Sequence, residues 1–135
     1  MPHLVIQYTA NLDAEADMTA LCRELAAVLV AQKDEQGQPL FPIGGTRVLA
    51  YPAPHYAVAD GQRDYAFAYL NLRIAPGRPD ALKKRAGDAI LERAKGFFYS
   101  MFERRPIGLT LQIDESPGQV YDAKHSNIHR LFNNP

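Results

Sequence analysis

Apolar side chains recur with two different periods along the first half of the chain. Residues 3–9 are rich in β-branched and aromatic side chains, which predicts a strand that begins directly after Pro2. From about residue 14 to 32, apolar side chains recur every three to four positions and predict a helix with one apolar stripe. Residues 33–45 are polar and interrupted by glycine and proline, as in a connection, and a second strand is predicted over residues 46–51.

The second half of the chain repeats this order of elements. Over residues 65–74, aromatic and polar side chains alternate with alanine and aliphatic side chains, and this period of two predicts a third strand. Pro79 and Asp80 then occupy positions where the first turn of a helix favours a proline and an acid, and helical spacing continues to about Arg104. Residues 107–114 alternate again and predict a fourth strand.

The pattern therefore consists of two βαβ halves, about residues 2–55 and 64–115, followed by a polar tail over residues 116–135. Such a repeat predicts a single α+β domain, spanning residues 1–135, in which one four-stranded sheet carries both helices on one face. The tail contains one short amphipathic stretch, residues 128–132, and we expect this stretch to dock on a surface that the sequence does not identify.

The other face of such a sheet has no helix to cover it. Tyr65, Phe67 and Tyr69 alternate with the residues that would face the helices, so they or their neighbours place apolar surface on the uncovered side. A monomer seldom exposes an apolar patch of this kind. The pattern therefore predicts an oligomer.

Composition and charge exclude several classes of protein. Fifteen Lys and Arg balance 15 Asp and Glu, which argues against a nucleic-acid partner bound through phosphate neutralisation. The single cysteine, Cys22, excludes an intramolecular disulfide and lies on the apolar stripe of the first helix, so we interpret it as a buried thiol. No signal peptide and no apolar run of about 20 residues is evident, so we expect a soluble cytoplasmic protein without a membrane partner.

Two of the four histidines have a spacing that metal sites use. His125 and His129 stand four positions apart, which on a helix would place both rings on one face. No third ligand accompanies them, so we expect no metal there and predict instead that His129 makes a contact of the tail.

Several short motifs follow one another along the chain in a fixed order and spacing. They are Met1-Pro2-His3, Phe41-Pro42, Gly45-x-Arg47, the run from Ala59 to Phe67, Gly77-Arg78, and Asn127-x-His129-x-Leu131-Phe132. In these motifs the chain resembles the 5-carboxymethyl-2-hydroxymuconate isomerase family of the tautomerase superfamily. The resemblance covers almost the whole chain and implies a tautomerase/MIF-like fold, in which two βαβ units form each subunit of a homotrimer. This fold agrees with the one that the hydrophobic pattern predicts.

The resemblance also implies a reaction and a base. The family moves a proton along a dienol to give the isomeric unsaturated 2-oxo acid during breakdown of homoprotocatechuate, and it needs no cofactor. Pro2 would be the base once Met1 is removed. A secondary amine suits this task because burial and nearby cations disfavour its protonated form and lower its pKa towards neutrality.

Two arginines match the positions of the family's site. Such substrates carry several carboxylates and develop negative charge on the 2-oxo oxygen, which a planar guanidinium can stabilise. The resemblance implies a catalytic role for Arg47 and substrate binding for Arg78, which lies at the positive end of the second helix. Weaker candidates for the pocket are Arg63, Arg73, Tyr8 and Phe67.

Two alternatives remain open at this point. The chain could keep the fold and Pro2 but hydrate, decarboxylate or dehalogenate another acid, since one fold hosts several chemistries. It could also be a non-enzymatic trimer that binds an acid, in which Pro2 never becomes a free amine.

Overall fold

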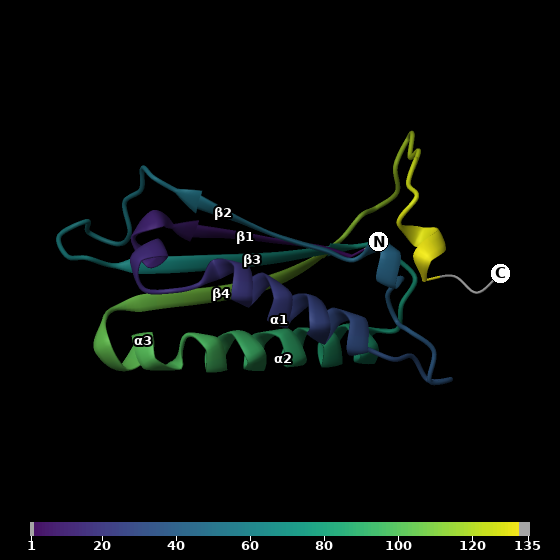
Figure 1. Cartoon of the computed structure of the whole chain (residues 1–135), viewed down its shortest axis with the longest axis horizontal. Helices are drawn as coiled ribbons and strands as arrows, with labels where there is room; N and C mark the ends of the chain where they lie inside the picture. Colours follow the sequence, from purple (N-terminus) through teal and green to yellow (C-terminus); the bar gives the residue numbers. More distant parts are fainter. Residues whose placement is uncertain (1, 133–135) are drawn as a thin grey trace.

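The computed structural model describes residues 2–132, in which a four-stranded sheet carries its helices on one face (Figure 1). The strands are β1 (His3–Thr9), β2 (Arg47–Ala53), β3 (Ala66–Ile74) and β4 (Ile107–Glu115). They lie in the order β2-β1-β3-β4, with the central pair antiparallel and each outer strand parallel to its neighbour. Each half is thus a parallel βαβ unit, and the predicted fold is confirmed.

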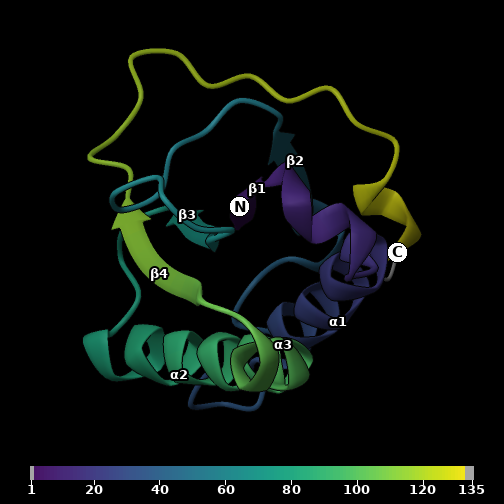
Figure 2. The same cartoon turned by 90° about the vertical axis from the view of Figure 1, so that its left-hand side faces the viewer.

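Both long helices lie on the same side of the sheet, as Figure 2 shows. They are α1 (Met18–Ala31) and α2 (Asp80–Phe97), and α2 is followed by the short α3 (Tyr99–Arg104). Three short 3-10 helices complete the chain: η1 (Ala10–Ala14), η2 (Ile43–Gly45) and η3 (His129–Leu131). Within residues 2–132, no helix is both long and apolar enough to span a membrane.

The core lies between the sheet and the helices. On α1, the side chains of Leu21, Leu25 and Leu29 recur at helical spacing and are fully buried. Cys22 is half-buried and packs against this core, and burial raises the pKa of its thiol, as expected for a structural cysteine. On β3, every second side chain faces the helices and is buried: Ala66, Ala68, Leu70, Leu72 and Ile74.

Both helices differ at one end from the prediction. The first begins at Met18 rather than near residue 14, because the Asp17 carboxylate accepts a hydrogen bond from the Ala20 amide at 3.0 Å and caps the helix there. The second does not continue to Arg104. It ends at Phe97, and the backbone of Phe98 (φ −92°, ψ 6°) changes direction where its ring enters the core, fully buried and edge-on to Phe97.

The strands begin or end within two residues of the predicted positions. β2 runs to Ala53 and includes Pro52, which the pattern alone would exclude from a strand. Pro52 is tolerated because β2 is an edge strand, so its missing amide donor removes no bond to a further strand.

The face of the sheet opposite the helices is open and partly apolar, as predicted. Phe67 and Tyr69 of β3 point away from the helices and are half-buried. On β2, Leu49 and Tyr51 expose 47% and 53% of their surface. This open face is therefore an apolar surface that the chain's own helices leave uncovered.

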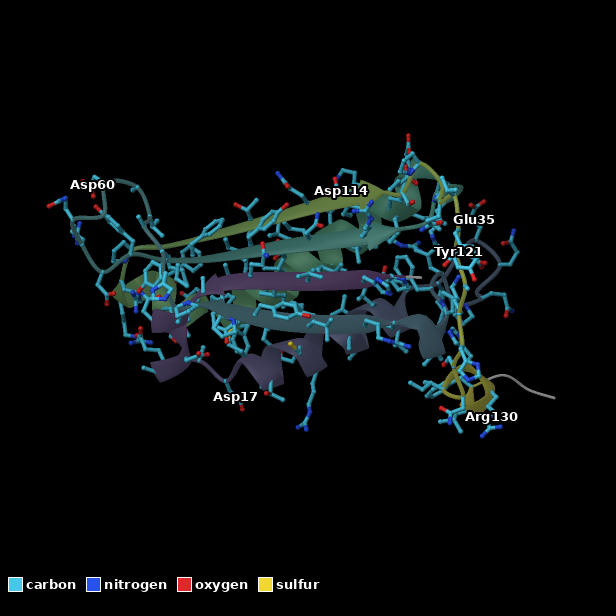
Figure 3. The ribbon with its side chains drawn as sticks, turned by 90° about the horizontal axis from the view of Figure 1, so that it is seen from above. Asp17, Glu35, Asp60, Asp114, Tyr121 and Arg130 are labelled. Atoms are coloured by element: carbon cyan, nitrogen blue, oxygen red, sulfur yellow. The ribbon has the colours of Figure 1, made fainter. Side chains whose placement is uncertain are left out.

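The tail leaves β4 and crosses one end of the sheet to the side of β2 (Figure 3). The labelled Asp114, Tyr121 and Arg130 mark its path in that view, and Figure 2 shows the same arc on the side away from the helices. The tail ends at η3, which packs against η2. A Cβ atom on Gly44 would lie only 2.7 Å from the Cα of His129, so this close approach requires a glycine. The predicted tail contact of His129 is confirmed.

The two tail histidines do not share a helix, because η3 begins only at His129. The spacing argument for a metal pair at His125 and His129 therefore does not apply to this conformation. Among residues 2–132, no group of three or more His, Cys, Asp or Glu side chains is placed to hold a metal ion.

Candidate active site

The predicted site residues gather at one end of the sheet. β1 and β2 begin at this end and β3 ends there, because β1 pairs in parallel with β2 and antiparallel with β3. The end of β4 is joined to it through the Ser116 amide, which donates to the Ile74 carbonyl at 2.9 Å. Figure 1 shows this end beside the N label, where the tail also crosses. Pro2, Arg47 and Arg78 all belong to this end of the molecule.

Pro2 is fully buried directly before β1. Its carbonyl accepts a hydrogen bond from the Arg47 amide at 3.1 Å, which continues the parallel pairing of β1 and β2 by one step. Proline fits the first position of a strand because its nitrogen offers no donor to the sheet. Removal of Met1 concerns a residue outside the described part of the chain.

The Arg47 side chain is held by backbone carbonyls. Its Nη1 donates to the carbonyls of Gly44 at 2.7 Å and Thr46 at 3.1 Å, both at the turn formed by η2. No carboxylate within residues 2–132 forms an ion pair with it. Its positive charge is therefore oriented but not neutralised, which is the arrangement that an anionic ligand requires.

Arg78 is held in a similar way and partly buried. Its Nε donates to the Leu40 carbonyl at 3.2 Å and its Nη1 to the Ala75 carbonyl at 3.1 Å, while its guanidinium lies 4.8 Å from the centre of the Phe41 ring. Burial lowers the pKa of Arg78 and the charge of Glu115 opposes that shift, but an arginine remains cationic near neutrality. Because Leu40 and Phe41 lead directly into η2, one segment positions both arginines.

Strand pairing adds two residues beside Arg47 on the open face. His3 lies opposite Arg47 on one side and Arg73 on the other, and Arg73 lies opposite Asp114. Paired residues project to the same face, so these side chains form a row across the sheet. Burial, together with nearby positive charge that includes Arg47, lowers the pKa of His3 and favours its neutral form. Sequence analysis missed His3 and ranked Arg73 low, because only the register brings them together.

The tail helps to line two open cavities at this end. One, of about 530 Å³, is lined by Arg47 and by tail residues only: His125, Ser126, Asn127, Ile128 and Arg130. The other, of about 190 Å³, includes His3, Arg73, Asp122 and Lys124 in its lining. Arg78 lines neither cavity. The sequence indicated that the tail docks, but not that it would build a cavity with Arg47.

Three of the weaker candidates for the substrate pocket, Tyr8, Phe67 and Arg63, lie at the opposite end of the sheet from Arg47. Tyr8 and Phe67 line a separate cavity of about 200 Å³ there, so they do not wall the cavity of Arg47. The Tyr8 hydroxyl donates to the Asp13 carboxylate at 2.7 Å, and burial together with this bond raises its pKa to about 12. Arg63 lines another cavity, together with Glu15 and Asp64.

The chain matches known proteins over nearly its whole length. Residues 2–132 match the protein-family model of 5-carboxymethyl-2-hydroxymuconate isomerase. A 5-carboxymethyl-2-hydroxymuconate Delta-isomerase of Escherichia coli is 30% identical over 132 residues, which are 98% of this chain and 99% of that protein.

Solved structures extend this similarity to the fold. A crystal structure of a 5-carboxymethyl-2-hydroxymuconate delta-isomerase superposes with a TM-score of 0.94 at 49% identity, covering 100% of this chain and 95% of that one. A 5-carboxymethyl-2-hydroxymuconate isomerase from Deinococcus radiodurans R1 gives a TM-score of 0.86 at 34% identity, covering 98% and 95% of the two chains. With the family match over residues 2–132, these similarities show that the chain belongs to the 5-carboxymethyl-2-hydroxymuconate isomerase family.

Proposed function

We propose that this protein is a cofactor-independent isomerase of an unsaturated 2-hydroxy or 2-oxo polycarboxylic acid, of the 5-carboxymethyl-2-hydroxymuconate type, in the catabolism of homoprotocatechuate. One observation carries the proposal. Pro2 is fully buried and its carbonyl accepts a hydrogen bond from the backbone amide of Arg47, whose side-chain charge is oriented by backbone carbonyls and forms no ion pair within residues 2–132. A base and an unneutralised cation on paired neighbouring strands suit proton transfer within an anion.

In the proposed reaction Pro2 is the base, which requires that its nitrogen is the chain terminus. The neutral secondary amine accepts a proton from one position of the conjugated acid. The resulting ammonium returns a proton two carbons away, so the product is an isomer and no oxidant or reductant is consumed. Burial of Pro2 supports this role, because a charged ammonium is disfavoured away from water and the neutral base is favoured.

The arginines stabilise the anionic parts of the substrate. Arg47 would stabilise the negative charge that develops on the 2-oxo oxygen during proton transfer. Arg78 would bind a carboxylate that does not react, through the Nη2 group, which has no hydrogen-bond partner within residues 2–132. Both guanidinium groups are preorganised by carbonyl contacts, so little reorganisation accompanies binding.

We further propose that the protein acts as a homotrimer. The open face of the sheet supports assembly, because the side chains of Leu49 and Tyr51 expose apolar surface there that the helices leave uncovered. Three copies related by a threefold axis form a closed arrangement in which each copy covers the open face of its neighbours.

The decisive experiment compares two forms of the same protein. Mass spectrometry of the intact chain separates a form that retains Met1 from one that begins at Pro2. In the retained form the Pro2 nitrogen is an amide without basicity, so we expect loss of isomerase activity by several orders of magnitude, measured as the ultraviolet absorbance change of the dienol. Full activity of the Met1-retaining form would exclude Pro2 as the base.

A further inference from the structure

The cavity that contains Arg47 is cationic and has no acidic residue in its lining. Its charged members are Arg47 and Arg130, with His125 as a third group that can carry a positive charge. This arrangement is unusual in a chain whose Lys and Arg are balanced by Asp and Glu. Its volume of about 530 Å³ lies within the range of roughly 300–1,000 Å³ that small-molecule sites occupy.

Arg130 itself has no partner among residues 2–132, with neither a hydrogen bond nor an ion pair. The cation of Lys124, in the same tail, is instead neutralised by Asp122 at 2.6 Å. Lys124 and Asp122 both line the smaller cavity, so the two cavities differ in the charge available to a ligand. Of these two cavities, only that of Arg47 and Arg130 has cations and no carboxylate in its lining.

The position of Arg130 is constrained by the fold. It lies within η3, one residue after His129, whose backbone packs against Gly44 of η2. The Gly44 carbonyl also accepts the hydrogen bond from Arg47 at 2.7 Å. Gly44 of η2 therefore positions both arginines. Its carbonyl accepts the hydrogen bond from Arg47, and its lack of a side chain lets the backbone of His129, next to Arg130, approach. Figure 3 shows Arg130 at the end of the sheet that carries the site.

The substrate type in the proposed function has two carboxylates that the assigned arginines do not account for, and the carboxymethyl carboxylate is one of them. A muconate has two carboxylates and the carboxymethyl group adds a third, while Arg47 is committed to the 2-oxo group and Arg78 to one carboxylate. We propose that Arg130 binds the carboxymethyl carboxylate and makes the enzyme selective for a tricarboxylate over a dicarboxylate. This inference rests on the proposed function and extends the site to the tail.

The test varies residue 130 of the enzyme and the carboxymethyl group of the substrate in the same set of assays. Wild type, Arg130→Gln and Arg130→Lys are assayed with 5-carboxymethyl-2-hydroxymuconate and with 2-hydroxymuconate, which lacks the carboxymethyl group. We expect Arg130→Gln to raise KM for the tricarboxylate roughly 10- to 100-fold with a much smaller change in kcat, because binding of a group remote from the reaction is lost. The preference for the tricarboxylate should collapse by a similar factor, and Arg130→Lys should restore part of it.

Lys124→Gln is the matched control. It removes a cation from the same tail, but one already paired with Asp122, so the substrate preference should stay that of wild type. Thermal unfolding and the mass of the assembly establish that each variant is folded. An equal loss on both substrates, or no loss on the tricarboxylate, would overturn the role of Arg130.

A wild-type protein that isomerises neither substrate would contradict the proposed function. The role of Arg130 in carboxylate binding would then be tested by a binding measurement without turnover. Calorimetry with propane-1,2,3-tricarboxylate and with succinate then decides. Tighter tricarboxylate binding by wild type than by Arg130→Gln supports the inference, and equal binding by the two proteins overturns it.

Discussion

Arg47 and Arg78 are both fixed by backbone carbonyls, but the two contact sets give the two side chains different roles. Arg47 contacts carbonyls of the short turn that precedes its own strand. Arg78 joins segments distant in sequence, through Leu40 and Ala75, and its guanidinium also stacks on Phe41. Loss of Arg47 therefore removes mainly charge, whereas loss of Arg78 removes charge and packing together.

Arg47→Ala should lower kcat by roughly tenfold to a thousandfold, because the side chain stabilises an intermediate, and should lower the free energy of unfolding by no more than Arg78→Ala, because it loses two local hydrogen bonds to the turn before its own strand and no ring packing. Steady-state kinetics and a denaturant titration measure the two effects. Arg63→Ala, at the opposite end of the sheet, is the control and should retain full turnover. Turnover of Arg47→Ala equal to wild type would remove Arg47 from the site.

Arg78→Ala should raise KM more than it lowers kcat, because a carboxylate remote from the reaction is bound equally in the ground and transition states. It should also lower the free energy of unfolding by about 1–3 kcal/mol, since one partly buried and one exposed hydrogen bond are lost together with the packing on Phe41. Steady-state kinetics measures KM and kcat, and denaturant unfolding of the same preparation measures the free energy of unfolding. A stability loss without any change in KM would assign Arg78 a purely structural role.

At the scale of elements, the contact between η2 and η3 determines where the tail lies. The two segments are distant in sequence, and no residue of η3 is buried, so the tail contributes little to the core. Its position depends on the absence of a side chain at Gly44, which lets the backbone of His129 approach. The cavity of Arg47 exists only while this contact holds.

Gly44→Ala should displace the tail, because the new methyl group would lie 2.7 Å from the Cα of His129 and backbone cannot yield as a flexible side chain does. We expect faster amide hydrogen exchange over residues 120–132 and weaker substrate binding. Gly96→Ala is the matched control: it has open space around it in α2 and should stabilise the protein by about 0.5–1 kcal/mol. Unchanged exchange in Gly44→Ala would show that the tail tolerates the methyl group.

At the scale of the whole molecule, the sheet separates a covered face from an open one. Helices α1 and α2 cover one face and bury the side chains that β1 and β3 direct towards them, while the open face combines aromatic side chains with the row of His3, Arg73 and Asp114 near the site. Assembly through this face would cover the apolar part and leave the polar row at its margin, next to the tail.

Tyr51→Asp should dissociate the proposed trimer, because it places a charge in the middle of the apolar part of the open face. Sedimentation should give about 45 kDa for wild type and about 15 kDa for the variant. Tyr99→Asp, on the helical side and 67% exposed, should remain a trimer. A wild-type mass of about 15 kDa would contradict the trimer.

The sequence by itself determined the order of elements and the face that each strand buries. The alternation over β3 and the helical spacing of Leu21, Leu25 and Leu29 are local patterns, and burial of one face follows from them directly. Family motifs identified Pro2, Arg47 and Arg78 as candidates, and the structure places all three at one end of the sheet.

Only the tertiary structure decided which distant residues meet. The register set His3 between Arg47 and Arg73, and the packing of η3 on η2 brought Arg130 into the cavity of Arg47. Burial of Phe98 ended the second helix before Arg104, against the local helical pattern. These features could not be predicted from periodicity, because periodicity reports which face of an element is apolar and contains no information on which other element will cover it.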